Sequence, residues 1–139
     1  MTRTFNAPVE DVFNTWVDPK LAEKWHGPEG FTNTIHEFDA REGGSYRLTM
    51  HAPNGETHPL RGVFKEIKRP TRLVMTWQWE QGGPDGAMGK ETLVTVEFKD
   101  RGGKTEMVFE HSGFANDEIK GMHEHGWSGS WSRLANIVE

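Results

Sequence analysis

Apolar residues recur with two different periods along the chain. Near both ends they recur every three or four residues, which is the spacing of one face of a helix. Between about residues 32 and 111 they alternate with polar residues, and turn signals such as Gly43-Gly44, Asn54-Gly55 and Gly102-Gly103 separate the segments. The pattern predicts a short first strand, two short helices, an antiparallel sheet and one long C-terminal helix.

Proline, glycine and N-cap residues indicate where these elements begin and end. Ala7-Pro8 and Asp18-Pro19 each begin a short helix, and Gly27-Pro28 ends the second one, in which Leu21 and Trp25 form a pair four residues apart. Asn116 caps a helix over 117–138. The expected strands are 3–6, 32–39, 45–51, 58–68, 72–80, 91–99 and 105–111. This order is typical of an α+β domain with a curved sheet wrapped on a helix, and we expect one such domain over residues 1–139.

Composition and charge argue against several classes of partner and site. The net charge of −5 lacks the basic footprint that nucleic-acid binding needs, so no nucleic-acid partner is expected. Without cysteine the chain has no disulfide or thiolate metal site, which fits a reducing compartment. No apolar run is long enough for a membrane span or a signal peptide. We therefore expect a cytoplasmic protein.

The long helix has small residues at the centre of its apolar face. Gly126 and Ser130 lie there with Trp127 and Trp131 to one side, and a glycine costs a helix interior about 1 kcal/mol relative to alanine. Two interpretations are open. The small residues let the helix pack closely on the sheet, or they leave a pocket beside the two indoles.

The sheet contributes an aromatic and methionine-rich inner face. Alternation places Tyr46, Leu48 and Met50 on one side of their strand, and likewise Leu73, Met75, Trp77 and Trp79, and Met107, Phe109 and His111. Such residues line ligand cavities, although a large aromatic core has the same pattern. The glycine-rich segment 81–90 is longer than a hairpin needs and is a candidate for an access loop.

Histidines are the candidates for chemistry. His123 and His125 point about 160° apart on a helix and cannot share a metal, and His111 with His123 alone makes too few ligands, so no metal or cofactor is expected. No nucleophile elbow, phosphate loop or dinucleotide motif is present. His111, His123 or Tyr46 as a general acid or base is the enzymatic alternative.

Several segments resemble the activator of heat-shock-protein-90 ATPase homologue family, over essentially the whole chain. They are Asn6-Ala7-Pro8, the stretch from Trp16 to Trp25-His26-Gly27-Pro28, GFTNTIHEFDAREGGSYRLTMHAPNG, RPTRLVMTW and HEHGWSGSWSRLANIV. The resemblance implies the START-related, birch-pollen-allergen-like (SRPBCC) helix-grip fold. It places Trp25, Gly27 and Pro28 at the end of the second helix, and Gly126, Trp127 and Leu134 on the gripping helix. His26 stands where the family often has a second tryptophan.

The resemblance also implies a hydrophobic cavity between sheet and C-terminal helix. The main hypothesis is binding of a small hydrophobic or amphipathic molecule, lipid-like or aromatic and polyketide-like. The alternatives are an enzyme acting on such a molecule, or a stress-response domain that contacts a chaperone, for which the sequence shows no exposed apolar stripe. The expected ligand-binding residues are Trp25, Tyr46, Leu48, Met50, Met75, Trp77, Trp79, Phe109, His111, His123, Gly126, Trp127, Ser130 and Trp131.

Overall fold

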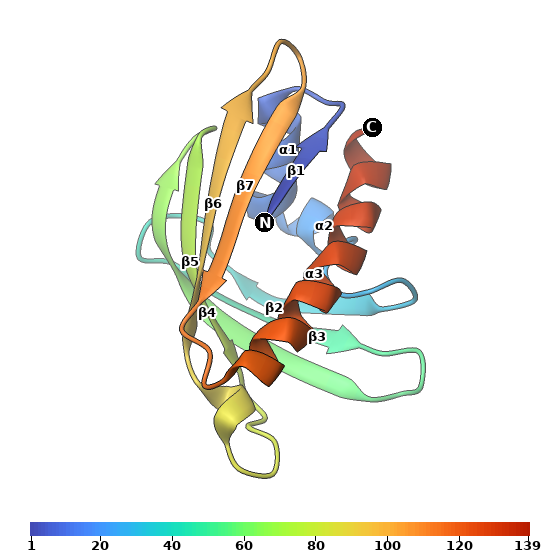
Figure 1. Cartoon of the computed structure of the whole chain (residues 1–139), viewed down its shortest axis with the longest axis vertical. Helices are drawn as coiled ribbons and strands as arrows, with labels where there is room; N and C mark the ends of the chain where they lie inside the picture. Colours follow the sequence, from blue (N-terminus) through green and yellow to red (C-terminus); the bar gives the residue numbers. More distant parts are fainter.

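A computed structural model describes residues 1–139 and shows a seven-stranded antiparallel sheet that curves around one long helix (Figure 1). The strand order is β1-β7-β6-β5-β4-β3-β2. The predicted strands and the long helix agree with the structure to within one residue at each end. The elements are β1 (Thr2–Phe5), α1 (Val9–Val17), α2 (Pro19–Ala22), β2 (Thr32–Phe38), β3 (Ser45–His51), β4 (Thr57–Lys68), β5 (Arg72–Trp79), η1 (Ala87–Gly89), β6 (Thr92–Asp100), β7 (Thr105–Ser112) and α3 (Asp117–Val138).

Two irregularities shape the sheet. The β2–β3 ladder shifts register between Ile35 and Glu37, and the β4–β5 ladder shifts between Phe64 and Glu66. Bulges of this kind bend a strand and increase its twist. Both lie in strands β2–β5, and such bulges contribute to the curvature of the sheet, whose concave inner face lies toward α3 (Figure 1).

Gly62 on β4 allows one close approach across this face. A Cβ on Gly62 would lie 2.2 Å from the carbonyl oxygen of Thr76 and 2.5 Å from the ring of Tyr46. The Tyr46 hydroxyl donates to that same carbonyl, and the Thr76 hydroxyl accepts from the backbone N–H of Val63. The missing side chain therefore permits the tyrosine ring to cover the strand.

The second helix is shorter than expected. Asp18 caps it by accepting from the Lys20 N–H, but the helix ends at Ala22, so the prediction that Leu21 and Trp25 share a helical face is wrong. Trp25 lies in the turns that follow and is fully buried, because its indole donates to the carbonyl of Thr15 at 2.8 Å and its ring packs against Trp16. This tertiary packing overrides the helical spacing.

The core lies between the concave face and the helices. It contains 24 buried residues in one cluster, and α3 contributes Trp127, Trp131, Leu134 and Ala135 to it. Asn116 accepts from the Ile119 N–H and caps α3 as expected. None of the helices combines the length and the apolar composition that crossing a membrane requires.

Candidate functional site

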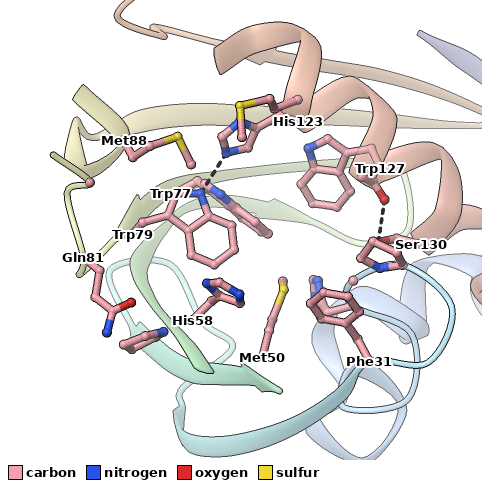
Figure 2. Close-up of a pocket in the computed structure, with 17 residues that line it drawn as sticks. Phe31, Met50, His58, Trp77, Trp79, Gln81, Met88, His123, Trp127 and Ser130 are labelled. Atoms are coloured by element: carbon pink, nitrogen blue, oxygen red, sulfur yellow. Dashed lines mark hydrogen bonds between the residues drawn. The ribbon is translucent and has the colours of Figure 1, made fainter. Parts of the chain in front are cut away.

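A cavity of about 390 Å³ lies between the concave sheet and α3 (Figure 2). Figure 2 shows Met50 and His58 of the sheet on one side of this space and His123 and Trp127 of α3 on the other. Its lining, which defines the sheet–helix cavity, is His26, Gly27, Pro28, Phe31, Met50, His58, Pro59, Trp77, Trp79, Gln81, Gly83, Met88, Met122, His123, Gly126, Trp127 and Ser130. The volume falls in the range of about 300–1,000 Å³ that is usual for small-molecule sites.

The glycines of α3 have different surroundings. A Cβ on Gly126 would meet no atom within 4 Å, so this residue faces open space. A Cβ on Gly129 would lie 3.3 Å from Cα of Pro28. Close packing therefore explains Gly129, whereas Gly126 borders the cavity. Ser130, one turn further along, folds its hydroxyl back onto the Gly126 carbonyl at 3.1 Å.

The structure divides the expected site residues into two groups. Those that line the sheet–helix cavity are Met50, Trp77, Trp79, His123, Gly126, Trp127 and Ser130. Those that do not line it are buried elsewhere, and they are Trp25, Tyr46, Leu48, Met75, Phe109, His111 and Trp131. Alternation identifies the inner face of a strand, but side chains from other elements of the buried cluster fill much of the space over that face. Trp131, for example, packs edge-on against Phe109, with ring centroids 4.9 Å apart.

Other lining residues, which sequence reasoning did not select, come from loops, a strand end, η1 and α3. Phe31, His58, Pro59, Gln81, Gly83, Met88 and Met122 belong to this set. For three of these residues the sequence does contain a signal, because Gln81, Gly83 and Met88 all lie on the glycine-rich segment 81–90. The Gln78 amide anchors this segment by donating to the Gly89 carbonyl at 3.0 Å. His26, Gly27 and Pro28 were indicated only by the family resemblance.

His111 lies behind the cavity with both ring nitrogens engaged. Its Nδ1 accepts from the indole N–H of Trp127 at 3.0 Å, so the proton of the neutral ring resides on Nε2. That Nε2 lies 2.7 Å from the hydroxyl of Thr92, which in turn donates to the Trp77 carbonyl. A second proton on His111 would face the Trp127 N–H.

His123 is fixed in the opposite tautomer. The indole of Trp79 donates to its Nε2 at 2.8 Å (Figure 2). Nδ1 therefore carries the proton and donates to the Ile119 carbonyl at 2.8 Å. The two imidazoles lie edge to face, with centroids 5.2 Å apart. Two indoles thus hold two neutral histidines, His123 in the wall of the cavity and His111 behind that wall.

The pKa values follow from this packing. Burial, and secondarily the neighbouring His123, lowers the pKa of His111 from 6.5 to about 3. Burial also lowers the pKa of His123, partly offset by its bond to Ile119. Burial raises the pKa of Tyr46 well above 10.0. Each general acid or base candidate from the sequence is therefore already hydrogen-bonded within the fold and stabilised in its neutral form.

The segment after α2 forms a further wall, and Arg133 of α3 holds it in place. The guanidinium donates to the carbonyls of Lys24, His26, Gly27 and Pro28 at distances of 2.8–3.1 Å. These bonds fix the backbone that carries His26. The His26 ring stacks on Trp25 with centroids 4.0 Å apart and is only 3% exposed.

Two residues that line the cavity each carry a buried nitrogen that has no hydrogen-bond partner in the protein. These nitrogens are Nδ1 of His26 and Nε1 of Trp77, and both residues are 3% exposed. Burial, and then the charge of Arg133, lowers the pKa of His26 from 6.5 to about 3, so this ring is neutral near pH 7. An unsatisfied buried polar group is unfavourable by about 1–3 kcal/mol.

The lining of the sheet–helix cavity contains no Asp, Glu, Lys or Arg. A second hollow, of about 740 Å³, lies on the far side of His123 and Trp127, between the end of β7 and the start of α3. Its lining includes Phe109 and His111 together with charged Glu110, Asp117, Lys120 and Glu124. Charged side chains therefore line the second hollow but not the sheet–helix cavity.

No group of three or more His, Asp or Glu side chains in the structure could hold a metal ion.

Comparison with known proteins places this fold. The family model described as Activator of Hsp90 ATPase homolog 1-like protein matches residues 6–139. No curated protein matches the chain. A crystal structure from Chromobacterium violaceum is similar over 100% of this chain and 94% of its own, with 27% identity and a TM-score of 0.86.

Two further solved structures share the architecture. The AHSA1 protein from Silicibacter pomeroyi is 25% identical, covers 98% of this chain and 93% of its own, and gives a TM-score of 0.83. A protein from Arthrobacter aurescens is 23% identical, with 98% and 82% covered and a TM-score of 0.83, which shows the fold. With a family match over nearly the whole chain, this protein belongs to the Activator of Hsp90 ATPase homolog 1-like family.

Proposed function

We propose that this protein binds a small hydrophobic or amphipathic molecule, lipid-like or aromatic, in the sheet–helix cavity. The observation that carries the proposal is the open space over Gly126, where α3 presents no side chain to the sheet. Indole, phenyl and thioether groups from Trp77, Phe31 and Met50 surround this space. Such groups adapt to irregular apolar ligands. The helix-grip superfamily, whose members include carriers of hydrophobic molecules, supports the same function.

A ligand panel tests the proposal. Thermal shift and native mass spectrometry with lipids and aromatic polyketide-like compounds should identify ligands that bind with 1:1 stoichiometry. Gly126→Leu, which places an isobutyl group in the cavity, should abolish that binding while the protein stays folded. Gly121→Leu is the matched control, because Gly121 lies on the same helix with no atom near its Cβ and does not line the cavity.

Two results would overturn the proposal. One is the absence of any saturable ligand across the panel. The other is equal binding by wild type and Gly126→Leu, which would place the ligand elsewhere. Unfolding of Gly126→Leu alone, with Gly121→Leu folded, would show that the space over Gly126 is needed for packing.

The two alternatives lack a supporting observation. His111, His123 and Tyr46 are all hydrogen-bonded within the fold, which does not favour them as acid or base in an enzyme. The exposed large apolar residues are Met1, Leu93 and Met122, which lie on separate elements, and this does not favour a chaperone-binding surface. A pull-down with a chaperone middle domain tests that contact directly. The cytoplasmic location stays a prediction from the sequence.

A further inference from the structure

The lining of the sheet–helix cavity is buried in one part and open to water in another. Trp77, Trp127 and Ser130 are each no more than 4% exposed. Gln81 is exposed, and the side chain of His58 retains 38% of its accessible surface. We call the part of the wall that His58 and Gln81 form the mouth of the cavity.

Most polar side chains of the lining are already hydrogen-bonded or buried. Those bonded to protein groups are Trp79, His123, Trp127 and Ser130. His26 and Trp77 are each only 3% exposed, so they present little polar surface to a ligand. Accessible hydrogen-bonding groups are therefore concentrated at the mouth, on His58 and Gln81.

The register of the sheet brings these two side chains together. The Glu80 N–H donates to the Pro59 carbonyl at 3.0 Å, in the register that the preceding pair of the β4–β5 ladder already has. One residue further out on each strand, His58 and Gln81 are therefore directly opposite each other. Figure 2 shows both on the sheet side of the cavity, across from α3. Opposite residues on one face have Cβ atoms about 4.5–5.5 Å apart, so one ligand group can contact both.

The charges near the mouth favour an uncharged ligand group. No Lys or Arg lines the cavity, and Nε2 of His58 lies 3.7 Å from a carboxylate oxygen of Glu56. An anionic group at His58 would therefore lie close to a negative charge. A cation gains little from Glu56, whose side chain is 66% exposed, because ion pairs in water are weak. Imidazole and carboxamide both donate and accept hydrogen bonds, as does a hydroxyl.

From these observations we propose that the ligand is an uncharged amphipathic alcohol. Its compact apolar body lies between Trp77 and Trp127, over Gly126, and its hydroxyl lies at the mouth between His58 and Gln81. This inference rests on the proposed function, because it names the ligand class of the same cavity and the direction in which the ligand lies.

Four probes with the same ring system test the polar group. Naphthylethanol carries the hydroxyl, propylnaphthalene replaces it by a methyl group, and naphthylacetate and naphthylethylamine carry a charge at that end. Calorimetry at pH 7 should show that naphthylacetate binds roughly tenfold more weakly than naphthylethanol, because no cationic side chain lines the cavity. Naphthylethylamine should bind no more tightly than naphthylethanol.

Variants assign the hydroxyl to the two side chains. His58→Phe and Gln81→Met keep the size of each side chain and remove its hydrogen bonds. Each should lower the affinity ratio of naphthylethanol to propylnaphthalene by about three- to tenfold. His51→Phe is the matched control, because His51 bonds to Thr34 and does not line the cavity. It should leave the ratio unchanged.

Nuclear Overhauser contacts in the wild-type protein give an independent readout of the ligand's direction. The side-chain amide of Gln81 and the ring of His58 should contact the methylene protons beside the hydroxyl of naphthylethanol. The indole of Trp127 should contact the naphthyl protons. The reverse pattern would overturn the proposal, and this measurement needs no variant to fold.

The outcomes distinguish the two proposals. An affinity ratio that His58→Phe or Gln81→Met leaves unchanged, with Gly126→Leu still blocking both neutral probes, would overturn the mouth assignment and leave cavity binding standing. Tighter binding of naphthylacetate or naphthylethylamine than of naphthylethanol would overturn the uncharged class. Failure of every probe and of the wider panel to bind would overturn the proposed function itself.

Discussion

Replacing Gly126 by alanine provides a quantitative test of the open space over α3. Gly126 lies inside a 22-residue helix, and its Cβ would contact nothing within 4 Å. The substitution therefore gains helix propensity of about 1 kcal/mol without steric cost. For a chain of this size that corresponds to a rise in melting temperature of about 4 °C.

The other glycines of the helix provide internal comparisons. Gly121→Ala should stabilise the protein by the same amount, because its Cβ would also meet no neighbour. Gly129→Ala should gain little or lose stability, since its Cβ would lie 3.3 Å from Cα of Pro28. Urea denaturation of the three variants, with unchanged slopes, measures these differences.

The relative stabilities of the three variants show whether open space lies over Gly126. A Gly126→Ala protein that is less stable than wild type, beside a stabilised Gly121→Ala, would refute the reasoning, because it would show that α3 packs directly on the sheet at this position. In that case the cavity and the function proposed for it would both lose their main support.

Three more predictions concern the groups around the cavity. Gly62→Ala should lower the free energy of unfolding by about 1–3 kcal/mol, because the new methyl group would overlap the Tyr46 ring and the Thr76 carbonyl; an unchanged urea midpoint would contradict this. Tyr46→Phe should cost about 1 kcal/mol through loss of its hydrogen bond to Thr76 and leave ligand affinity unchanged, so a large loss of affinity in calorimetry would argue against the assignment of Tyr46 to the core. The folded-state pKa values of His26 and His111, both about 3, lie below the unfolded value near 6.5, so the unfolded chain binds more protons and stability should fall as the pH decreases from about 6.5 toward 3. Denaturation midpoints across this range should fall less steeply in His111→Gln, and identical slopes would show that His111 does not contribute.

The fold was largely encoded in local patterns. Glycine and proline positions, the alternation between Ser45 and His51 and the helical spacing after Asn116 each depend on near neighbours in the chain, so the predicted strands and the long helix agree with the structure. The predicted end of α2 is wrong because contacts with another helix, and not local spacing, place the residues that follow it. Trp25 is positioned by Thr15 and Trp16 of another helix, and no spacing within its own segment reveals that.

The cavity could be predicted only in part. Glycine at position 126 signalled a missing side chain, and alternation placed Trp77 on the inner face. Whether an inward residue meets solid core or open space depends on what the other elements put opposite it. Tyr46 and Phe109 point inward like Trp77, yet the packing of Phe64 against Tyr46 and of Trp131 against Phe109 excludes them from the cavity.

Sequence by itself determined the order of the elements, the composition of the inner face and the gap in the C-terminal helix, because these properties are periodic and local. Tertiary structure alone decided which side chains share the cavity, and which of its nitrogens remain without a partner. Hydrogen bonds such as those from Trp79 to His123 and from Trp127 to His111 join residues 44 and 16 positions apart. Their formation depends on how the sheet curves around the helix, which no single segment of the chain specifies.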